Sequence, residues 1–221
     1  MQAFRADSPL VKGIRIFVDL LFLSMLWVLC SLPVLTLGLS TAALMDLAHR
    51  NIVRTDGILF LDWFRSIRKN WKLTFPTGAL FAAAMGLQAA DAFLLRRLLQ
   101  AGSRIGLAWP LFLITGAFTI GLFLWTMFCC NQYDSSWKET LKNGVFLAIA
   151  NLPLTAVLVL TVLAAALLIW LIPAGLFVLP ALAALACGEL IRRAMVRSGY
   201  LEKDPDPEKA ARTETEPNWR K

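Results

Sequence analysis

Long stretches dominated by apolar residues recur along this chain. They cover residues 14–48, 73–95, 105–130 and 145–191, and short polar or basic segments separate them. A helix rises about 1.5 Å per residue, so about 20 apolar residues cross a hydrocarbon core about 30 Å thick. The pattern therefore predicts an all-α fold, a polytopic bundle of transmembrane helices.

The first and last stretches are each too long for one crossing, and each contains a turn signal. Leu32-Pro33 interrupts the first, because the residue before a proline is pushed out of the α region. Pro173, followed by Gly175, interrupts the last. We therefore expect about six spans in three hairpins, at residues 14–32, 34–48, 73–95, 105–130, 145–170 and 174–191. The short span 34–48 is either a helix shielded by its neighbours or a re-entrant segment.

Composition agrees with a membrane protein, since 58% of residues are hydrophobic and 17% are charged. Soluble domains contain about 45–50% apolar residues. The spans define one transmembrane domain, residues 1–197. The remaining segment, 198–221, is rich in proline and charge, which predicts a disordered cytoplasmic tail.

Lysine and arginine positions predict the orientation of the spans, because cytoplasmic loops collect these residues. With six spans, 19 of the 22 lysines and arginines lie on the face that holds both termini. Only Arg96, Arg97 and Arg104 lie on the other face. Both termini are therefore expected in the cytoplasm. The net charge of +7 does not indicate a nucleic-acid partner, because the cations flank apolar spans and no groove-reading motif is present.

Residues 58–72 have the pattern of an amphipathic helix at the membrane interface. Apolar and aromatic residues recur at spacings of three and four, and cations fill the positions between them. The apolar set is Phe60, Trp63, Phe64, Ile67 and Trp71, and the basic set is Arg65, Arg68, Lys69 and Lys72. This helix contacts either membrane lipid or a partner protein, and Trp63, Arg65, Arg68 and Lys69 are its candidate contact residues.

Small residues form a stripe on the span that follows. Gly78, Ala82, Gly86 and Ala90 occur at every fourth position, so they share one face of a helix. Small residues on one face permit close approach of another helix. We take Gly78, Ala82 and Gly86 as candidate contacts with a partner's span.

Ionisable and polar residues inside spans are few, and such residues are the first place to look for function. Asp19, Asp46 and Glu189 each have a basic residue three or four positions away, typical of an ion pair along one helix face. Gln88 and Asp91 form a candidate polar site near the outer end of span 73–95. Asp91 lines a water-filled mouth, binds a partner or extends to the outer headgroups.

The fifth span begins with Asn151-Leu152-Pro153. Proline has no N–H group, so it frees a backbone carbonyl and kinks the helix. Asn151 is expected either to satisfy the freed carbonyl or to contact the polar connector near Trp137.

No motif of a known enzyme class occurs in the chain. There is no G-x-S-x-G, H-E-x-x-H or P-loop sequence, and His49 is the single histidine. We therefore expect no catalytic residues, no metal site and no cofactor. The four cysteines lie in or beside apolar stretches and include no C-x-x-C motif, so a zinc site is not expected.

Several blocks of the sequence resemble the YesL family, bacterial integral membrane proteins of unknown function. The blocks are Asp7-Ser8-Pro9-Leu10, residues 26–34 (LWVLCSLPV), residues 38–44 (GLSTAAL) and residues 63–71 (WFRSIRKNW). Weaker similarity covers residues 140–143 and Asn151-Leu152-Pro153. The chain departs from the family at Leu154, where an arginine is common, so no charged contact is expected there.

The resemblance implies a location and a biological setting. It implies a multi-pass protein of the bacterial plasma membrane, often encoded beside sugar-import ABC transporters of Gram-positive bacteria. We therefore expect a non-enzymatic accessory subunit of a carbohydrate ABC importer, with the permease and ATPase subunits as possible partners. The alternative is an autonomous small-solute transporter or channel, which predicts that Gln88, Asp91, Asn131 or Asn151 line a polar path.

Overall fold

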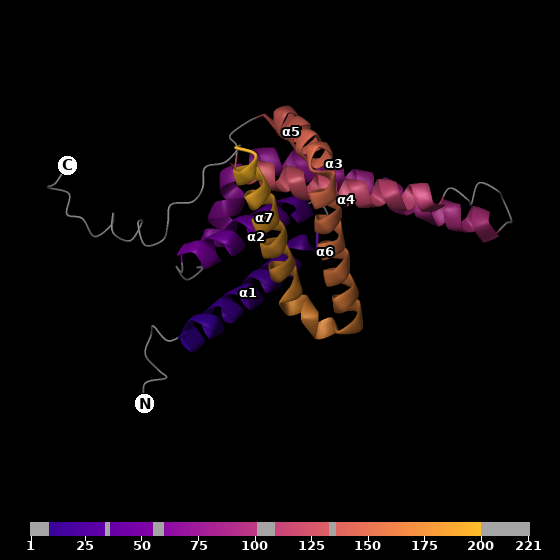
Figure 1. The fold of residues 1–221 in the computed structure, drawn as a ribbon. Helices are drawn as coiled ribbons and strands as arrows, with labels where there is room; N and C mark the ends of the chain where they lie inside the picture. The colour runs from indigo at the N-terminus through magenta and orange to yellow at the C-terminus, as the bar shows by residue number, and fades with distance from the viewer. Residues whose placement is uncertain (1–8, 34–35, 55–59, 101–108, 133–135, 200–221) are drawn as a thin grey trace.

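The computed structural model describes residues 9–33, 36–54, 60–100, 109–132 and 136–199, without the side chains of 9–12 and 50–54. This part of the chain contains α-helices, one 3-10 turn and no strand (Figure 1). The elements are α1 (Pro9–Ser31), α2 (Leu37–Arg54), α3 (Phe60–Gln100), α4 (Trp109–Gln132), α5 (Trp137–Ala150), α6 (Leu152–Leu171), η4 (Pro173–Phe177) and α7 (Leu179–Arg197). The predicted all-α fold is confirmed.

Four of the described helices are long and apolar enough to cross a membrane. They are α1 from Gly13 onward, α3, α4 and α6. The predicted spans 34–48 and 174–191 correspond to α2 and α7, which do not belong to this group. Both helices are less apolar, since α2 contains Asp46 and α7 ends in basic residues. The count of six spans and the cytoplasmic termini therefore stay predictions.

Helix α2 lies at the centre of the described structure and contacts α1, α3, α4 and α7. Residues 40–45 are all buried, and they cover more than one full helical turn. A helix that is buried on every face is shielded by protein rather than by lipid. Of the two alternatives for segment 34–48, the structure therefore contains the short shielded helix.

The turn between α1 and α2 lies where Pro33 predicts it. α1 ends at Ser31, and Thr36 closes the turn by donating its backbone N–H to Pro33 O at 2.8 Å. Two side-chain hydrogen bonds then join the helices. Ser31 Oγ and Ser40 Oγ lie 2.8 Å apart, and Trp27 Nε1 donates to Thr41 Oγ1 at 3.2 Å. These bonds fix the register of the hairpin.

Helices α2 and α3 approach most closely where two glycines meet. A Cβ atom placed on Gly38 would lie 2.5 Å from Gly78 Cα, and one placed on Gly78 would lie 2.8 Å from Gly38 Cα. These separations are too short for real Cβ contacts, so both positions require glycine at this spacing. Small residues allow such backbone contact between helices in membranes. The α2–α3 pair also makes the most extensive contact between any two elements.

The part of segment 58–72 that the structure describes, from Phe60 onward, is not a separate helix, which corrects the prediction from its sequence. It continues without a break into the following span as the single 41-residue helix α3. Pro76 lies inside this helix, and the hydroxyls of Thr74 and Thr77 donate to Asn70 O and Leu73 O one turn earlier. The two predicted elements adjoin at Lys72 and Leu73, and neither residue is a helix breaker. The helix therefore has no reason to end there.

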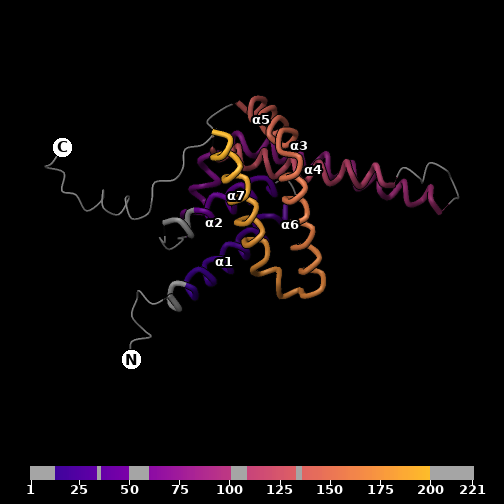
Figure 2. Tube along the Cα trace, in the orientation of Figure 1, coloured from indigo at the N-terminus to yellow at the C-terminus, as the bar shows by residue number. Residues whose placement is uncertain are grey.

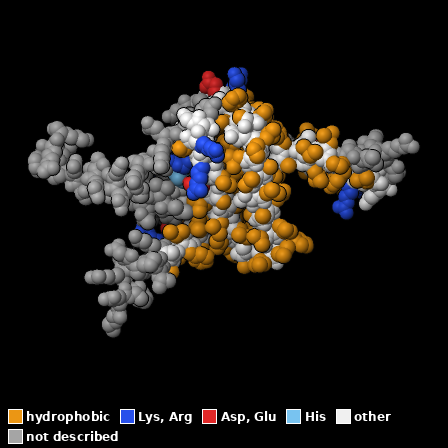
Figure 3. Space-filling view, in the orientation of Figure 1, with side chains coloured by type: hydrophobic (Ala, Val, Ile, Leu, Met, Phe, Trp, Pro, Cys, Tyr) orange, Lys and Arg blue, Asp and Glu red, His pale blue; other side chains and the backbone are white. Residues whose placement is uncertain are grey.

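The second half of α3 and the first half of α4 form an arm that extends away from the other helices (Figure 1). Gln88 Nε2 on α3 donates to Thr119 Oγ1 on α4 at 2.9 Å, and Phe81 packs edge-to-face on Phe123 at 5.5 Å. Within the predicted span 105–130, the described helix α4 begins at Trp109. Apolar side chains cover most of the visible surface of the arm (Figure 3).

Helices α6 and α7 form a second projection, joined at its far end by η4 (Figure 2). The turn falls at Pro173 and Gly175, as the sequence predicts. The predicted span 145–170, however, is two helices rather than one. α5 ends at Ala150 and α6 begins at Leu152, because Pro153 has no N–H group with which to continue the hydrogen bonds of α5.

The break between α5 and α6 is closed by one buried hydroxyl. Thr155 Oγ1 lies 3.0 Å from both Ala148 O and Asn151 O, and it accepts a hydrogen bond from Trp125 Nε1 at 3.0 Å. Asn151 itself donates its side-chain amide to Leu147 O at 3.2 Å. Leu147 O also accepts the backbone N–H of Asn151 at 3.0 Å, so it is not the carbonyl that Pro153 frees, and the first role expected of Asn151 stays a prediction.

Two predictions fall on parts of the chain that the structure does not describe. Arg104 lies in 101–108, and the tail predicted to be disordered, 198–221, lies outside the described residues after Gly199.

Replacement of Gly78 by alanine tests the glycine contact. Its new Cβ would meet the backbone of Gly38, and overpacking of this kind costs about 1–3 kcal/mol. We expect Gly78→Ala to lower the thermal unfolding midpoint of the purified protein in detergent. Gly86→Ala is the matched control, because nothing lies within 4 Å of its Cβ position and alanine favours helix by about 1 kcal/mol. Equal midpoints for the two variants would contradict the contact.

Replacement of Thr155 by valine tests the bridge at the helix break. Valine keeps the shape but leaves the buried Trp125 indole N–H without its acceptor, at a cost of about 1–3 kcal/mol. We expect a lower free energy of unfolding for Thr155→Val. Thr161→Val on the same helix is the control, because that hydroxyl donates only to Val157 O of its own helix. If both variants unfold alike in denaturant, the bridge contributes nothing.

Candidate functional site

A cluster of polar side chains lies where the second half of α2 meets α3, α4 and α7. Asp46 Oδ2 on α2 accepts a hydrogen bond from Ser66 Oγ on α3 at 2.9 Å. Asn131 Nδ2, at the end of α4, donates to Ala42 O on α2 at 2.8 Å. Both bonds join residues that are far apart in sequence, so they fix α2 against two different helices.

An ion pair completes the cluster on the side of α7. Glu189 Oε1 accepts from Arg193 Nε at 2.7 Å, and Glu189 Oε2 lies 3.8 Å from His49 Nδ1 on α2. The sequence predicted the first contact, between residues four positions apart. It did not predict that Glu189 also faces His49 across two helices, because the partner of a charged residue on another helix cannot be read from spacing.

A small cleft of about 20 Å³ opens into this cluster. Asp46, His49, Asn131, Gln132 and Arg192 line it, together with two apolar side chains. A space of this size holds about one water molecule. The cleft therefore has room for a bridging water, and the contacts of the cluster join α2 to α3, α4 and α7.

Within the described residues, no three histidine, cysteine, aspartate or glutamate side chains come close enough to hold a metal ion. Cys129, Cys130 and Cys187 are buried in the protein. Asp19, expected to pair along α1, has one carboxylate oxygen that is buried and accepts no hydrogen bond in the described structure.

The basic segment at the start of α3 presents an exposed face. Arg65, Arg68 and Lys69 are all exposed, and Arg65 Nη1 lies 3.5 Å from Asp62 Oδ1 one turn away. Phe60 and Phe64 are about half exposed and pack edge-to-face at 4.9 Å. Aromatic and cationic side chains are thus exposed together on this segment, whereas the amphipathic pattern placed the two kinds on different faces of the helix.

Trp63 departs from that prediction. It is fully buried, although the sequence placed it among the residues that contact lipid or a partner. Spacings of three and four could not separate the two sides of this helix, because a second apolar face packs on α2 next to Ser66. Trp63 is therefore a core residue, and the contact surface consists of its exposed neighbours.

The residues of the predicted stripe lie in two kinds of surroundings. One is packed inside the chain, and the others are half-buried or exposed. Gly78 packs on Gly38 within the chain and is not accessible to a partner. Ala82 is half-buried, and Gly86 and Ala90 are exposed on the arm. The spacing of small residues identifies the stripe, but it does not show whether the helix packed on the stripe belongs to the same chain or to a partner.

The two residues of the candidate polar site differ in their surroundings. Gln88 bonds to Thr119 and joins α3 to α4. Asp91 is exposed near the end of α3, about one turn further along the helix. The two do not converge on a pocket, so a polar site at this position gains no support from the contacts of Gln88.

Comparison with known proteins gives one match. Residues 20–92, about a third of the chain, match the family model described as "Protein of unknown function, DUF624", the family to which YesL-like proteins belong. The match spans the second half of α1, all of α2 and most of α3. No curated protein and no solved structure matches the chain. The matched region contains the central helix and the glycine contact, so it covers the structural centre of the molecule.

Replacement of Ser66 by alanine tests whether the polar cluster stabilises the fold. The change removes a donor to the Asp46 carboxylate, and hydrogen bonds to charged groups contribute about 1.5–3 kcal/mol. We expect a lower free energy of unfolding, measured by denaturant titration in detergent. Ser198→Ala, at an exposed position beyond the end of α7, should leave it unchanged. A Ser66→Ala variant as stable as the parent protein would show that this bond is dispensable.

Proposed function

We propose that this chain is a non-enzymatic, multi-pass protein of the bacterial plasma membrane that acts as an accessory subunit of a carbohydrate ABC importer. The observation that supports it best is the exposed face at the start of α3, which we call the α3 docking face. Its residues are Phe60, Leu61, Phe64, Arg65, Arg68 and Lys69.

The geometry of α3 favours a protein partner over a lipid surface. A 41-residue helix is about 60 Å long, whereas a bilayer with its headgroups is about 40–45 Å thick. The docking face belongs to the same continuous helix as the span, so it cannot fold back to lie flat on the headgroups. With residues 73–95 in the hydrocarbon core, the docking face projects into the cytoplasm.

The exposed aromatic and aliphatic side chains of the docking face would then contact a partner protein rather than lipid. Phe60 is 53% exposed, Leu61 68% and Phe64 48%, and contiguous apolar patches of this kind mark protein interaction sites. The adjacent cations favour a partner surface with acidic residues at its rim. A permease or ATPase subunit would present its cytoplasmic surface at the same side of the membrane as the α3 docking face. The resemblance to YesL-like proteins supports a sugar importer as the assembly.

The alternative, an autonomous transporter or channel, needs polar groups that line a continuous path. The three amides suggested for such a path make separate contacts instead. Gln88 joins α3 to α4, Asn131 joins α4 to α2, and Asn151 caps α5. The alternative therefore ranks second.

Charge reversal on the α3 docking face tests the proposal. We expect Arg65→Glu, Arg68→Glu and Lys69→Glu, combined in the full chain and expressed in its native host, to reduce co-purification of ABC permease and ATPase chains at least ten-fold. The physical reason is repulsion from the acidic rim of the partner. Quantitative mass spectrometry after gentle solubilisation measures the recovery. Lys138→Glu with Lys142→Glu, two exposed cations on α5, is the matched control.

A photo-crosslinker in place of Arg68 separates the possible partners. Crosslinks to a permease or ATPase chain support the proposal. Crosslinks to lipid alone, or full recovery of importer chains with the reversed docking face, would overturn it.

A further inference from the structure

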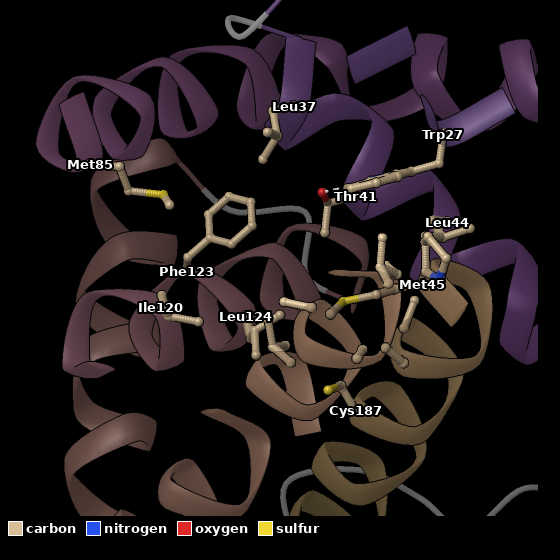
Figure 4. A pocket seen from close by; sticks show the side chains of 17 residues that line it. Trp27, Leu37, Thr41, Leu44, Met45, Met85, Ile120, Phe123, Leu124 and Cys187 are labelled. Atoms are coloured by element: carbon tan, nitrogen blue, oxygen red, sulfur yellow. Dashed lines mark hydrogen bonds between the residues drawn. The ribbon is translucent and has the colours of Figure 1, made fainter. Parts of the chain in front are cut away.

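An apolar cavity of about 270 Å³ lies between α2, α3, α4, α6 and α7, beside Trp27 of α1 (Figure 4). Its walls include Met85 of α3, Phe123 of α4, Ile169 of α6 and Cys187 of α7. It differs in chemistry from the polar cluster, since its lining contains no charged residue. The α3 docking face contributes no residue to it, so a ligand in this cavity would be independent of the proposed function.

The chemistry of the lining selects for hydrocarbon. Thr41 is the single hydroxyl among the lining residues, and its oxygen already accepts a hydrogen bond from Trp27 Nε1 at 3.2 Å (Figure 4). The remaining walls are aliphatic, aromatic or sulfur-containing side chains. A bound water needs two to four polar partners, so the lining holds water poorly, whereas a hydrocarbon group loses no hydrogen bond on entering it.

The volume matches a segment of a hydrocarbon chain. An apolar cavity of about 150 Å³ is large enough for benzene, which has six carbon atoms. At the same density, this cavity of about 270 Å³ holds about ten carbons. Ten carbons in a row correspond to more than half of a common phospholipid acyl chain.

The cavity reaches the surface between two helices that are apolar enough to cross a membrane. Met85 on α3 is 41% exposed, and Ala166 on α6 is exposed, although both also line the cavity. The surface of the same two helices carries exposed leucines, at 66% for Leu87 and 59% for Leu167. Where α3 and α6 cross a bilayer, as their length and apolarity permit, an opening between them would face its hydrocarbon interior.

We propose that this cavity binds one acyl chain of a bilayer phospholipid, which enters laterally between α3 and α6 while its headgroup stays outside. The bound chain fills the space between the α6–α7 hairpin and the central helix α2.

Photolabelling of the full chain in nanodiscs tests this proposal. The probe is phosphatidylglycerol with a diazirine at the middle of one acyl chain, and mass spectrometry maps the labelled residues. We expect label on Met85, Phe123 or Cys187. Ala165→Phe places a ring in the cavity and should reduce that label at least five-fold. Ala164→Phe is the matched control, because Ala164 is exposed on the same helix and does not line the cavity.

Three results would overturn the proposal. One is label that is absent from the lining residues while exposed residues such as Leu167 are labelled. Another is lining label that persists in Ala165→Phe. The third is displacement of the label by an equimolar polyprenyl phosphate, which would make an isoprenoid chain the occupant. Size-exclusion chromatography checks that each variant is folded, and Ala183→Leu on α7 replaces Ala165→Phe if that variant aggregates.

Discussion

The backbone contact between Gly38 and Gly78 is the constraint on which the other helices depend. It brings α2 against α3 at a distance that only glycine permits, and so places α2 inside the molecule rather than at its edge. Because the turn at Pro33 ties α1 to α2, the same contact positions α1. The hairpin of α6 and α7 packs against this group of helices, and α7 contacts α2 directly.

The burial of α2 explains why its sequence is less apolar than that of a lipid-facing span. A polar group inside a membrane protein is tolerated when other helices satisfy it. Thr41 meets Trp27, Asp46 meets Ser66, and His49 faces Glu189. These partners come from α1, α3 and α7, so the polar residues of α2 specify which neighbour lies on which side. The polar cluster therefore contributes to the arrangement of the helices, and the exposed face of α3 remains available for recognition.

Hydropathy and turn residues predicted the helical class, the hairpin at Pro33 and the turn at Pro173, because these features depend on local sequence. The break at Asn151 was hidden within a continuous apolar stretch, and only the position of Pro153 signalled it. The continuity of α3 was missed because the change from a basic to an apolar segment resembles a boundary although nothing there ends a helix. The roles of Gly78, Trp63 and Gln88 depend on neighbours from other helices, which spacing along one chain does not identify.

Residues 40–48 of helix α2 are buried, apart from the half-buried Asp46, and thiol accessibility tests this enclosure most directly. Single cysteines are placed at each of positions 42, 43, 47 and 48, which are buried and line neither the apolar cavity nor the polar cleft, and at exposed Ala164 for comparison, in protein reconstituted in liposomes. The protein is treated with a small lipid-permeable maleimide, and mass spectrometry locates the modified residue. An enclosed α2 gives strong labelling at position 164 and protection at all four positions of α2. Labelling of any one of the four at the rate of position 164 would show that α2 has a face open to lipid or water, and would contradict its place at the centre of the molecule.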